Sequence, residues 1–146
     1  MIRIQHEDFD VAAELAALTW RGSAIGAVAT FTGHVRADDG LVALTLEHYP
    51  AMTEGEIARH VAQAEKRWPL LGVAVIHRVG RLVPGERIVF VGVAASRRGD
   101  AFAACEFLID YLKVRAPFWK QEEREGATAW VEAKPGDDAA AERWRK

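Results

Sequence analysis

The sequence predicts an α+β domain whose sheets are mostly antiparallel. Segments with helical periodicity are mixed with strand-like segments, without the regular strand, helix, strand rhythm of a parallel sheet. Neighbouring strand-like segments are separated by short stretches rich in turn residues. No repeat, low-complexity tract or linker divides the 146 residues, a length at which one hydrophobic core can form. One domain over residues 1–146 is therefore expected, with a charged tail from about residue 134.

The first fifty residues are expected to form a short opening segment, a helix and two strands. Asp8 or Asp10 can cap a helix over residues 11–18, because a carboxylate there accepts the free amide hydrogens of the first turn. Residues 25–35 are small, β-branched or aromatic, and residues 42–49 roughly alternate between apolar and polar side chains. The turn-like stretch between them indicates a hairpin.

A second helix and two further strands are expected in the middle of the chain. Apolar residues recur at helical spacing within residues 52–68, and Pro69 follows directly. Residues 73–80 and 87–95 are strongly apolar, and the Pro-Gly pair between them supplies turn geometry. These two segments are predicted to be strands.

A third helix and a C-terminal hairpin complete the predicted order. Asp100 is placed to cap a helix that ends before Pro117. Cys105 falls on the apolar face of that helix, where a small buried thiol is unreactive, so we interpret it as a core residue rather than a nucleophile. Residues 118–123 and 128–133 flank a Glu-Gly turn and predict the hairpin.

Composition excludes several classes of protein. The 19 Lys and Arg residues against 21 Asp and Glu residues give a formal charge of −2, which argues against a general nucleic-acid binder. No apolar run has the roughly 18 residues of a membrane span, and the first residues lack the pattern of a signal peptide. The single cysteine excludes an internal disulfide and fits a reducing compartment. A cytoplasmic protein is expected.

Common cofactor and metal motifs are absent from the sequence. There is no glycine-rich dinucleotide fingerprint, no Walker-type phosphate loop and no serine elbow of a hydrolase. The histidines lack the close pairing of a zinc site on one helix, and each is interpreted as a surface or hydrogen-bonded strand histidine. They are His6, His34, His48, His60 and His77. Neither a metal nor a cofactor is expected.

Positive charge falls at four places where a hydrophobic core does not require it, and these places would form an anion site if they converged. They are Arg36 at a strand end, Arg97 and Arg98 before a helix, Lys113 and Arg115 at the end of that helix, and Lys120 beside aromatic residues. Two guanidinium groups next to the free amides of a helix start form a natural clamp for phosphate or carboxylate. The alternative is that these arginines are simply solvated in a loop.

Each lysine also has an ordinary structural interpretation. Lys113 in the last turn of a helix satisfies the helix dipole and the exposed carbonyls. Lys120 follows Phe118 and Trp119, and partial desolvation among aromatic rings favours a role in proton transfer, although a strand lysine can also extend its ammonium group to solvent. Glu122 shares a strand face with Lys120 and can pair with it.

Five segments that span most of the chain carry a family resemblance. They are GAVATFTGHVR (26–36), LTLEHYPAMTE (44–54), RWPLLGVAVIHRVG (67–80), PGERIVFVGV (84–93) and DYLKVRAPFWKQE (110–122). Together, and in this order and spacing, they are similar to the large, catalytic subunits of molybdopterin synthase. Tyr-Leu-Lys followed by Arg-Ala-Pro-Phe-Trp-Lys is the most specific signature.

The resemblance implies an α/β hammerhead-type fold and a homodimer at the centre of a heterotetramer. A ubiquitin-like small subunit docks at each end, and its C-terminal Gly-Gly tail carries a thiocarboxylate into a pocket of the large subunit. Two sulfurs are there transferred to cyclic pyranopterin monophosphate, which becomes molybdopterin. Because the partner supplies the nucleophilic sulfur, such a sulfurtransferase needs no catalytic cysteine of its own.

The resemblance also implies the site. Lys113 and Lys120 match the two family lysines at the chemical centre, where they handle protons and stabilise charge. Glu122 is expected to position a lysine or a substrate amine. Arg98 matches an arginine that reaches the substrate phosphate from the neighbouring protomer. The full set of implied substrate-binding residues is His34, Val35, Arg36, Arg97, Arg98, Gln121 and Glu122.

Two positions depart from the family pattern, and two other functions stay open. Arg97 stands where many relatives have histidine, and an arginine can bind phosphate but cannot shuttle protons near neutral pH. His34 stands where lysine is common, and it carries less charge at neutral pH. The alternatives are a noncatalytic docking module for a ubiquitin-like protein, and an unrelated phosphate-ligand binder that uses the Arg97 and Arg98 helix start.

Overall fold

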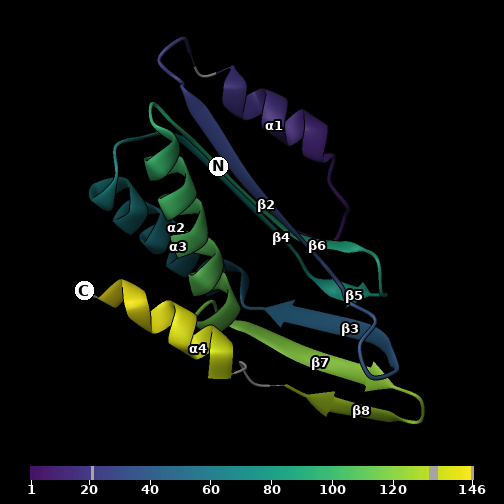
Figure 1. Cartoon of the computed structure of the whole chain (residues 1–146). Coiled ribbons are helices and arrows are strands. Elements are labelled where there is room, and N and C mark those ends of the chain that lie inside the picture. Colours follow the sequence, from purple (N-terminus) through teal and green to yellow (C-terminus); the bar gives the residue numbers. More distant parts are fainter. Residues whose placement is uncertain (21, 132–134, 146) are drawn as a thin grey trace.

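In the computed structural model, the described residues 1–20, 22–131 and 135–145 form two four-stranded sheets with helices packed around them (Figure 1). The first sheet has the order β1 (Ile2–Gln5), β4 (Leu70–Arg78), β6 (Arg87–Ala95), β2 (Ala27–His34). The second has the order β5 (Gly80–Leu82), β3 (Leu41–His48), β7 (Phe118–Arg124), β8 (Ala127–Trp130). Mixed secondary structure and mostly antiparallel sheets agree with the predicted class.

Strand pairing is antiparallel except at one edge. β1 runs parallel to β4, whereas β4 and β2 both run antiparallel to β6. All pairs of the second sheet are antiparallel. β4 and β6 confirm the two strands predicted at residues 73–80 and 87–95. β7 and β8 confirm the C-terminal hairpin, although residues 132–133 of the predicted second strand lie outside the described residues.

The predicted hairpin over residues 25–35 and 42–49 is wrong, although both strands exist. β2 pairs with β6 in the first sheet, and β3 pairs with β5 and β7 in the second. β6 is buried along nearly its whole length and therefore requires a neighbour on each side. After β2 the chain is held beside the β5–β6 turn and not against β3, because the Val35 amide donates to the Glu86 carbonyl at 2.9 Å.

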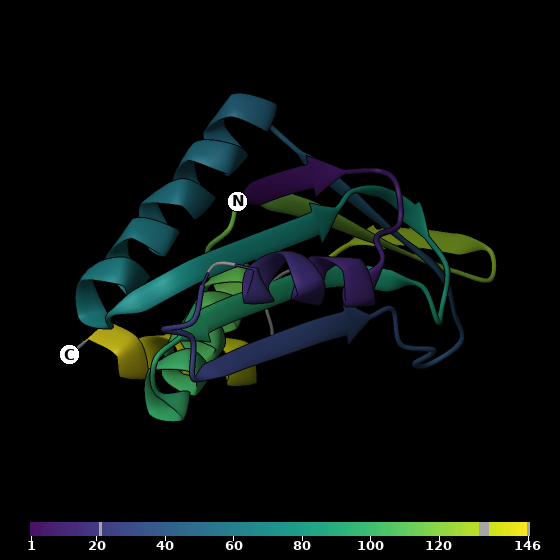
Figure 2. The ribbon, with the colours of Figure 1, turned by 90° about the horizontal axis from the view of Figure 1, so that it is seen from above.

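The helices cover both faces of the first sheet. α1 (Val11–Thr19) lies on one face, and α2 (Pro50–Arg67) and α3 (Arg98–Val114) lie on the other, as Figures 1 and 2 show. Asp10 caps α1 through its carboxylate, which accepts the Ala13 amide at 3.2 Å, as the sequence predicts.

Two helix starts differ from the prediction, and the charged tail is helical. α2 begins at Pro50, because proline fits the first helical turn. α3 begins at Arg98 rather than after Asp100, which lies in the first turn, where its charge suits the helix dipole. The charged tail folds into α4 (Pro135–Glu142) and a short 3₁₀ helix (Arg143–Arg145). Trp144 anchors it, because its indole nitrogen donates to Asp110 at 2.6 Å.

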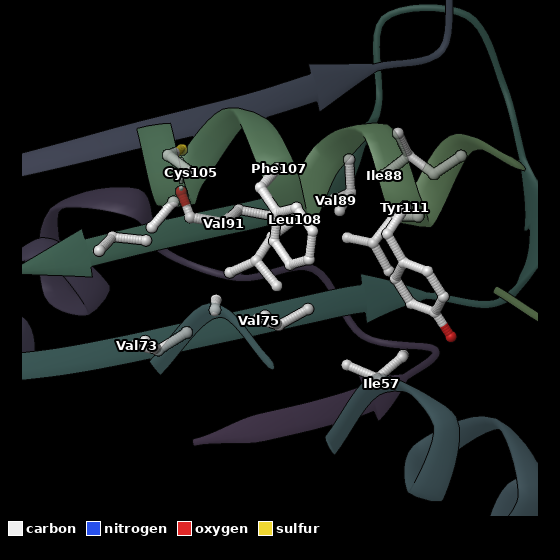
Figure 3. Close-up of a cluster of buried hydrophobic side chains, with 14 of the residues drawn as sticks. Ile57, Val73, Val75, Ile88, Val89, Val91, Cys105, Phe107, Leu108 and Tyr111 are labelled. Carbon is white, nitrogen blue, oxygen red and sulfur yellow. Dashed lines mark hydrogen bonds between the residues drawn. The ribbon is translucent and has the colours of Figure 1, made fainter. Parts of the chain in front are cut away.

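Alternate side chains of β4 and β6 build two hydrophobic cores. Val75 and Val91 face the α2–α3 side, whereas Ile76 and Phe90 face α1. Figure 3 shows the larger core beneath α3. Full burial of an aliphatic or aromatic side chain stabilises the fold by about 1.5–3 kcal/mol, so these strands contribute much of the stability and form a rigid base for the cleft.

Cys105 belongs to the larger core, as predicted. Its thiol is buried beside the Val91 carbonyl, at a distance of 3.8 Å (Figure 3). Burial raises the pKa of this thiol to about 11, with a smaller contribution from the charge of Glu106. The thiol therefore stays protonated at neutral pH and is a poor nucleophile.

Candidate active site

A cleft of about 800 Å³ lies where the end of β2, the end of α3 and strand β7 meet. One wall comes from β2 and the residues after it, from Phe31 to Arg36. Another comes from Lys113 at the end of α3, and the side chains of β3 and β7 complete the cleft. Residues far apart in the sequence are thus brought together between the two sheets.

Six of the nine predicted site residues line this cleft. They are His34, Val35, Arg36, Lys113, Lys120 and Glu122. The remaining three, Arg97, Arg98 and Gln121, do not line it. The predicted lysine pair therefore shares one cavity with the predicted arginine from the end of β2.

Strand alternation explains which residues of β7 reach the cleft. Phe118, Lys120 and Glu122 line it, whereas Trp119 and Gln121 belong to the opposite face of the strand. Trp119 is exposed, and its ring contacts Trp130 with a centroid distance of 6.2 Å. The prediction that Gln121 contacts the substrate is thus not supported within one chain. Of the two aromatic residues that precede Lys120 in the sequence, only Phe118 lies on the same face of β7 as the lysine.

Lys113 reaches the cleft from the last turn of α3. Its neighbours in that turn, Tyr111 and Leu112, are buried and hold the helix end against the sheet. The lysine itself is exposed, so it suits the helix dipole and faces the cavity at once.

The charges of both lysines act on one buried group, His77 of β4. This imidazole has a pKa lowered from 6.5 to about 4, first because it is buried and then because of Lys113, Lys120 and His48. A hydrogen bond from Nδ1 to the Arg78 carbonyl, at 2.9 Å, opposes the shift. His77 is therefore a neutral, hydrogen-bonded strand histidine, as the sequence indicated.

Carboxylates balance part of the positive charge at the cleft. Arg36 pairs with Asp38 at 2.6 Å, and its side chain is 72% exposed. Glu122 pairs with Arg124, and Arg124 also donates to the Asp39 carbonyl at 3.1 Å. Glu122 thus has a partner that sequence reasoning missed, two residues along the same strand face.

Arg97 and Arg98 lie at the other end of α3 and do not join the cleft within one chain. The helix has 17 residues, which corresponds to about 25 Å at 1.5 Å per residue. Both side chains are exposed at the helix start. Within a single chain the predicted cations therefore do not all converge, and Arg98 could serve a cleft only in another copy.

Over the part of the chain that the structure describes, no three His, Cys, Asp or Glu residues gather as a metal site would require. Among the same residues, no helix is both long enough and apolar enough to cross a membrane.

Together, the fold and the cleft define a class: an α+β domain with a concave site in which lysine and arginine side chains, partly balanced by carboxylates, can bind an anionic ligand. The family model described as MoaE protein matches residues 4–115. The molybdopterin synthase catalytic subunit of Mesorhizobium japonicum is 55% identical over 147 residues, which cover 99% of this chain and 92% of that protein. The chain therefore belongs to the MoaE family.

Solved structures agree with this assignment. The molybdopterin biosynthesis MoaE protein from Burkholderia ambifaria matches with a TM-score of 0.84 and 54% identity, covering 99% of this chain and 97% of that one. Molybdopterin synthase from Staphylococcus aureus matches with a TM-score of 0.80 and 30% identity, covering 88% and 94%. The resemblance found in the sequence is thus confirmed over nearly the whole chain.

Proposed function

We propose that this chain is the catalytic subunit of molybdopterin synthase, a sulfurtransferase of molybdenum cofactor biosynthesis. It takes two sulfurs from the C-terminal thiocarboxylate of a ubiquitin-like small subunit and transfers them to cyclic pyranopterin monophosphate. The observation that carries the proposal is the cleft of a MoaE-family chain in which Lys113 and Lys120 lie with Arg36. The poorly nucleophilic Cys105 fits a reaction whose sulfur comes from the partner.

Each transfer is a nucleophilic attack followed by hydrolysis. The thiocarboxylate sulfur attacks an oxygen-bearing carbon of the pterin side chain and forms a C–S bond, while a C–O bond at that carbon breaks and its electron pair leaves on the oxygen. The tail's acyl group is then joined to the pterin through that sulfur as a thioester. Water then cleaves the acyl–sulfur bond, leaving the sulfur on the pterin and a carboxylate on the tail. Lys113 and Lys120 supply and accept the protons of these steps and stabilise the oxyanion that forms at the acyl carbon.

The other residues of the cleft bind and orient the anionic substrate. Arg36, whose side chain is largely exposed, binds the phosphate with its guanidinium group. His34 and Val35 bring polar and backbone groups from the end of β2. Glu122 orients a lysine or a substrate amine, with Arg124 as its fixed partner.

The proposed assembly is a homodimer at the centre of a heterotetramer, with a hammerhead-type fold in each catalytic chain. Arg97 and Arg98 do not line the cleft of their own chain. In the proposed dimer, the second copy brings the start of its α3, with these two arginines, to the cleft. Their guanidinium groups would then bind the substrate phosphate. We also propose that residues 1–146 act as one domain and that the protein works in the cytoplasm.

The proposal is tested by incubating the purified chain with cyclic pyranopterin monophosphate and a small subunit whose tail ends in a thiocarboxylate. Molybdopterin should form, whereas a small subunit with an ordinary C-terminal carboxylate should bind equally well and give no product. Binding of the thiocarboxylated partner without any product would instead favour the docking-module function. Tight binding of the pterin phosphate that is indifferent to the partner would favour the simple phosphate-ligand binder.

A further inference from the structure

We infer that Thr53 and His77 are positioning residues that hold, from behind the cleft wall, the connector that joins Lys113 to Lys120. The connector consists of residues 115–117, between α3 and β7. The inference rests on the proposed function, because it assumes that both lysines take part in sulfur transfer. Neither Thr53 nor His77 lines the cleft, so each would act through the residues that it contacts.

The connector is short and tightly bonded to itself. At the end of α3, the amides of Arg115 and Ala116 both donate to the Tyr111 carbonyl, at 2.8 and 3.3 Å. The Phe118 amide then donates to the Ala116 carbonyl at 2.8 Å, which closes a three-residue turn around Pro117. The chain thus passes from the Lys113 helix turn into the Lys120 strand with few free dihedral angles, so a shift of this turn moves one lysine relative to the other.

Thr53 ties this turn to α2. Its side chain is fully buried, and its hydroxyl donates to the Pro117 carbonyl at 3.0 Å. The same hydroxyl accepts the Tyr49 amide at 3.2 Å, so it has a partner as donor and as acceptor. The carbonyl of Pro117 immediately precedes Phe118, the first residue of β7. One hydroxyl therefore links the start of α2 to the point where the chain enters the Lys120 strand.

His77 supports the next residue. Its ring stacks on Phe118 with a centroid distance of 4.0 Å and an interplanar angle of 23°. Because a carbonyl can only accept, the 2.9 Å bond to Arg78 places the proton on Nδ1 and fixes the plane of the ring. Phe118 itself lines the cleft. The stack thus joins the first sheet, through β4, to the strand of the second sheet that carries Lys120.

The polarity of these two positions favours positioning over simple packing. Over the described residues, the buried polar or charged side chains are Thr53, His77 and Arg78. Arg78 holds the carbonyls of His6 and Arg87, away from the connector. Thr53 contacts Pro117 and His77 contacts Phe118, the two residues where the connector enters β7. Burial of a polar group is costly unless it is hydrogen-bonded. Here the Thr53 bond fixes the backbone at Pro117, and the His77 bond fixes the ring that stacks on the Phe118 side chain.

Four variants test the inference in the assembled enzyme, with the thiocarboxylated small subunit and the pterin substrate. Thr53→Val keeps the shape but removes the hydroxyl, and Thr53→Ser restores it. His77→Ala removes the stacked ring, and His77→Phe restores a flat ring. Misplacement of a catalytic group by about 1 Å can cost a hundredfold in rate, so we expect kcat to fall at least tenfold in Thr53→Val and His77→Ala. The KM for the pterin should change less than twofold, and Thr53→Ser and His77→Phe should recover most of kcat.

A matched control separates positioning from loss of stability. Ile76 is the neighbour of His77 on β4 but faces the α1 side of the sheet. Ile76→Ala should lower the melting temperature by a similar amount and leave kcat unchanged. An equal fall of kcat in Ile76→Ala, at a matched melting temperature, would overturn the inference.

Lys113→Ala and Lys120→Ala, measured in parallel, distinguish failure of the inference from failure of the proposed site. If both lysine variants are inactive while Thr53→Val and His77→Ala keep the parent kcat, the inference is wrong and the proposed site stands. If both lysine variants keep full activity, the proposed site fails first, and the positioning inference fails with it.

Discussion

The buried imidazole of His77 should make the stability of the protein depend on pH in a way that one substitution removes. Its pKa is lowered to about 4 by burial and by the charges of Lys113, Lys120 and His48. In the unfolded chain, the same side chain has a pKa near its ordinary value of about 6.5. Above pH 6.5 the imidazole is mostly neutral in both the folded and the unfolded state, so its protonation costs no stability there.

As the pH falls below 6.5, the unfolded chain binds a proton that the folded protein does not, and the equilibrium moves toward the unfolded state. A gap of roughly 2.5 pKa units corresponds to a maximum loss of about 3 kcal/mol, reached below pH 4. At pH 5 the same two pKa values give a loss of about 2 kcal/mol relative to pH 7.5. Because the side chain is buried, this figure needs little reduction for solvent screening.

The measurement is urea unfolding of the parent and of His77→Phe at pH 7.5 and pH 5.0. The free energy of unfolding of the parent should fall by about 2 kcal/mol more than that of the variant between these pH values. His60, whose pKa is also lowered by burial, is present in both proteins and cancels in the difference. Equal losses in the two proteins would show that the burial and charges assigned to His77 are wrong.

Three further predictions concern the scaffold. Iodoacetamide at pH 8 should leave Cys105 unmodified in the folded protein and label it fully in urea, because burial keeps the thiol protonated and inaccessible; rapid labelling of the folded state would contradict this. Gly26→Ala should lower the free energy of unfolding by about 1–3 kcal/mol, because the added Cβ would lie 2.1 Å from the Ser96 carbonyl oxygen. A melting temperature equal to that of the parent would show that no such clash exists. Arg78→Met should cost roughly 3 kcal/mol in urea unfolding, since it leaves the carbonyl oxygens of His6 and Arg87 without the donor that now bonds them. A cost near zero would show that water replaces the guanidinium.

Local signals predicted much of the secondary structure. The carboxylate of Asp10 and the apolar spacing of α2 act within a few residues, so the sequence alone indicated those helices. Strand partners were harder to predict, because they depend on which strand edges remain unpaired once the chain has collapsed. β1 has only four residues and was not predicted, and β2 and β3 were assigned to one hairpin although they belong to different sheets.

The site was predicted from the family signature rather than from periodicity. Lys113, Lys120 and Arg36 lie in one cleft as that signature implied. Gln121 was implied by the family resemblance alone, and strand alternation puts it on the face of β7 opposite to Lys120. Thr53 could not be singled out from the sequence, because its burial and its bond to Pro117 arise only when residues 64 positions apart come together.

The most direct test of the proposed catalytic cleft is a single-turnover assay of molybdopterin formation by Lys113→Ala and Lys120→Ala, with the thiocarboxylated small subunit bound to each. Circular dichroism and binding of the partner should match the parent, because Lys113 is exposed and Lys120 lines a cleft rather than filling a core. We predict that product nearly disappears in either variant. Full product formation by both folded variants would contradict the claim that this cleft, with its two lysines, is the catalytic centre.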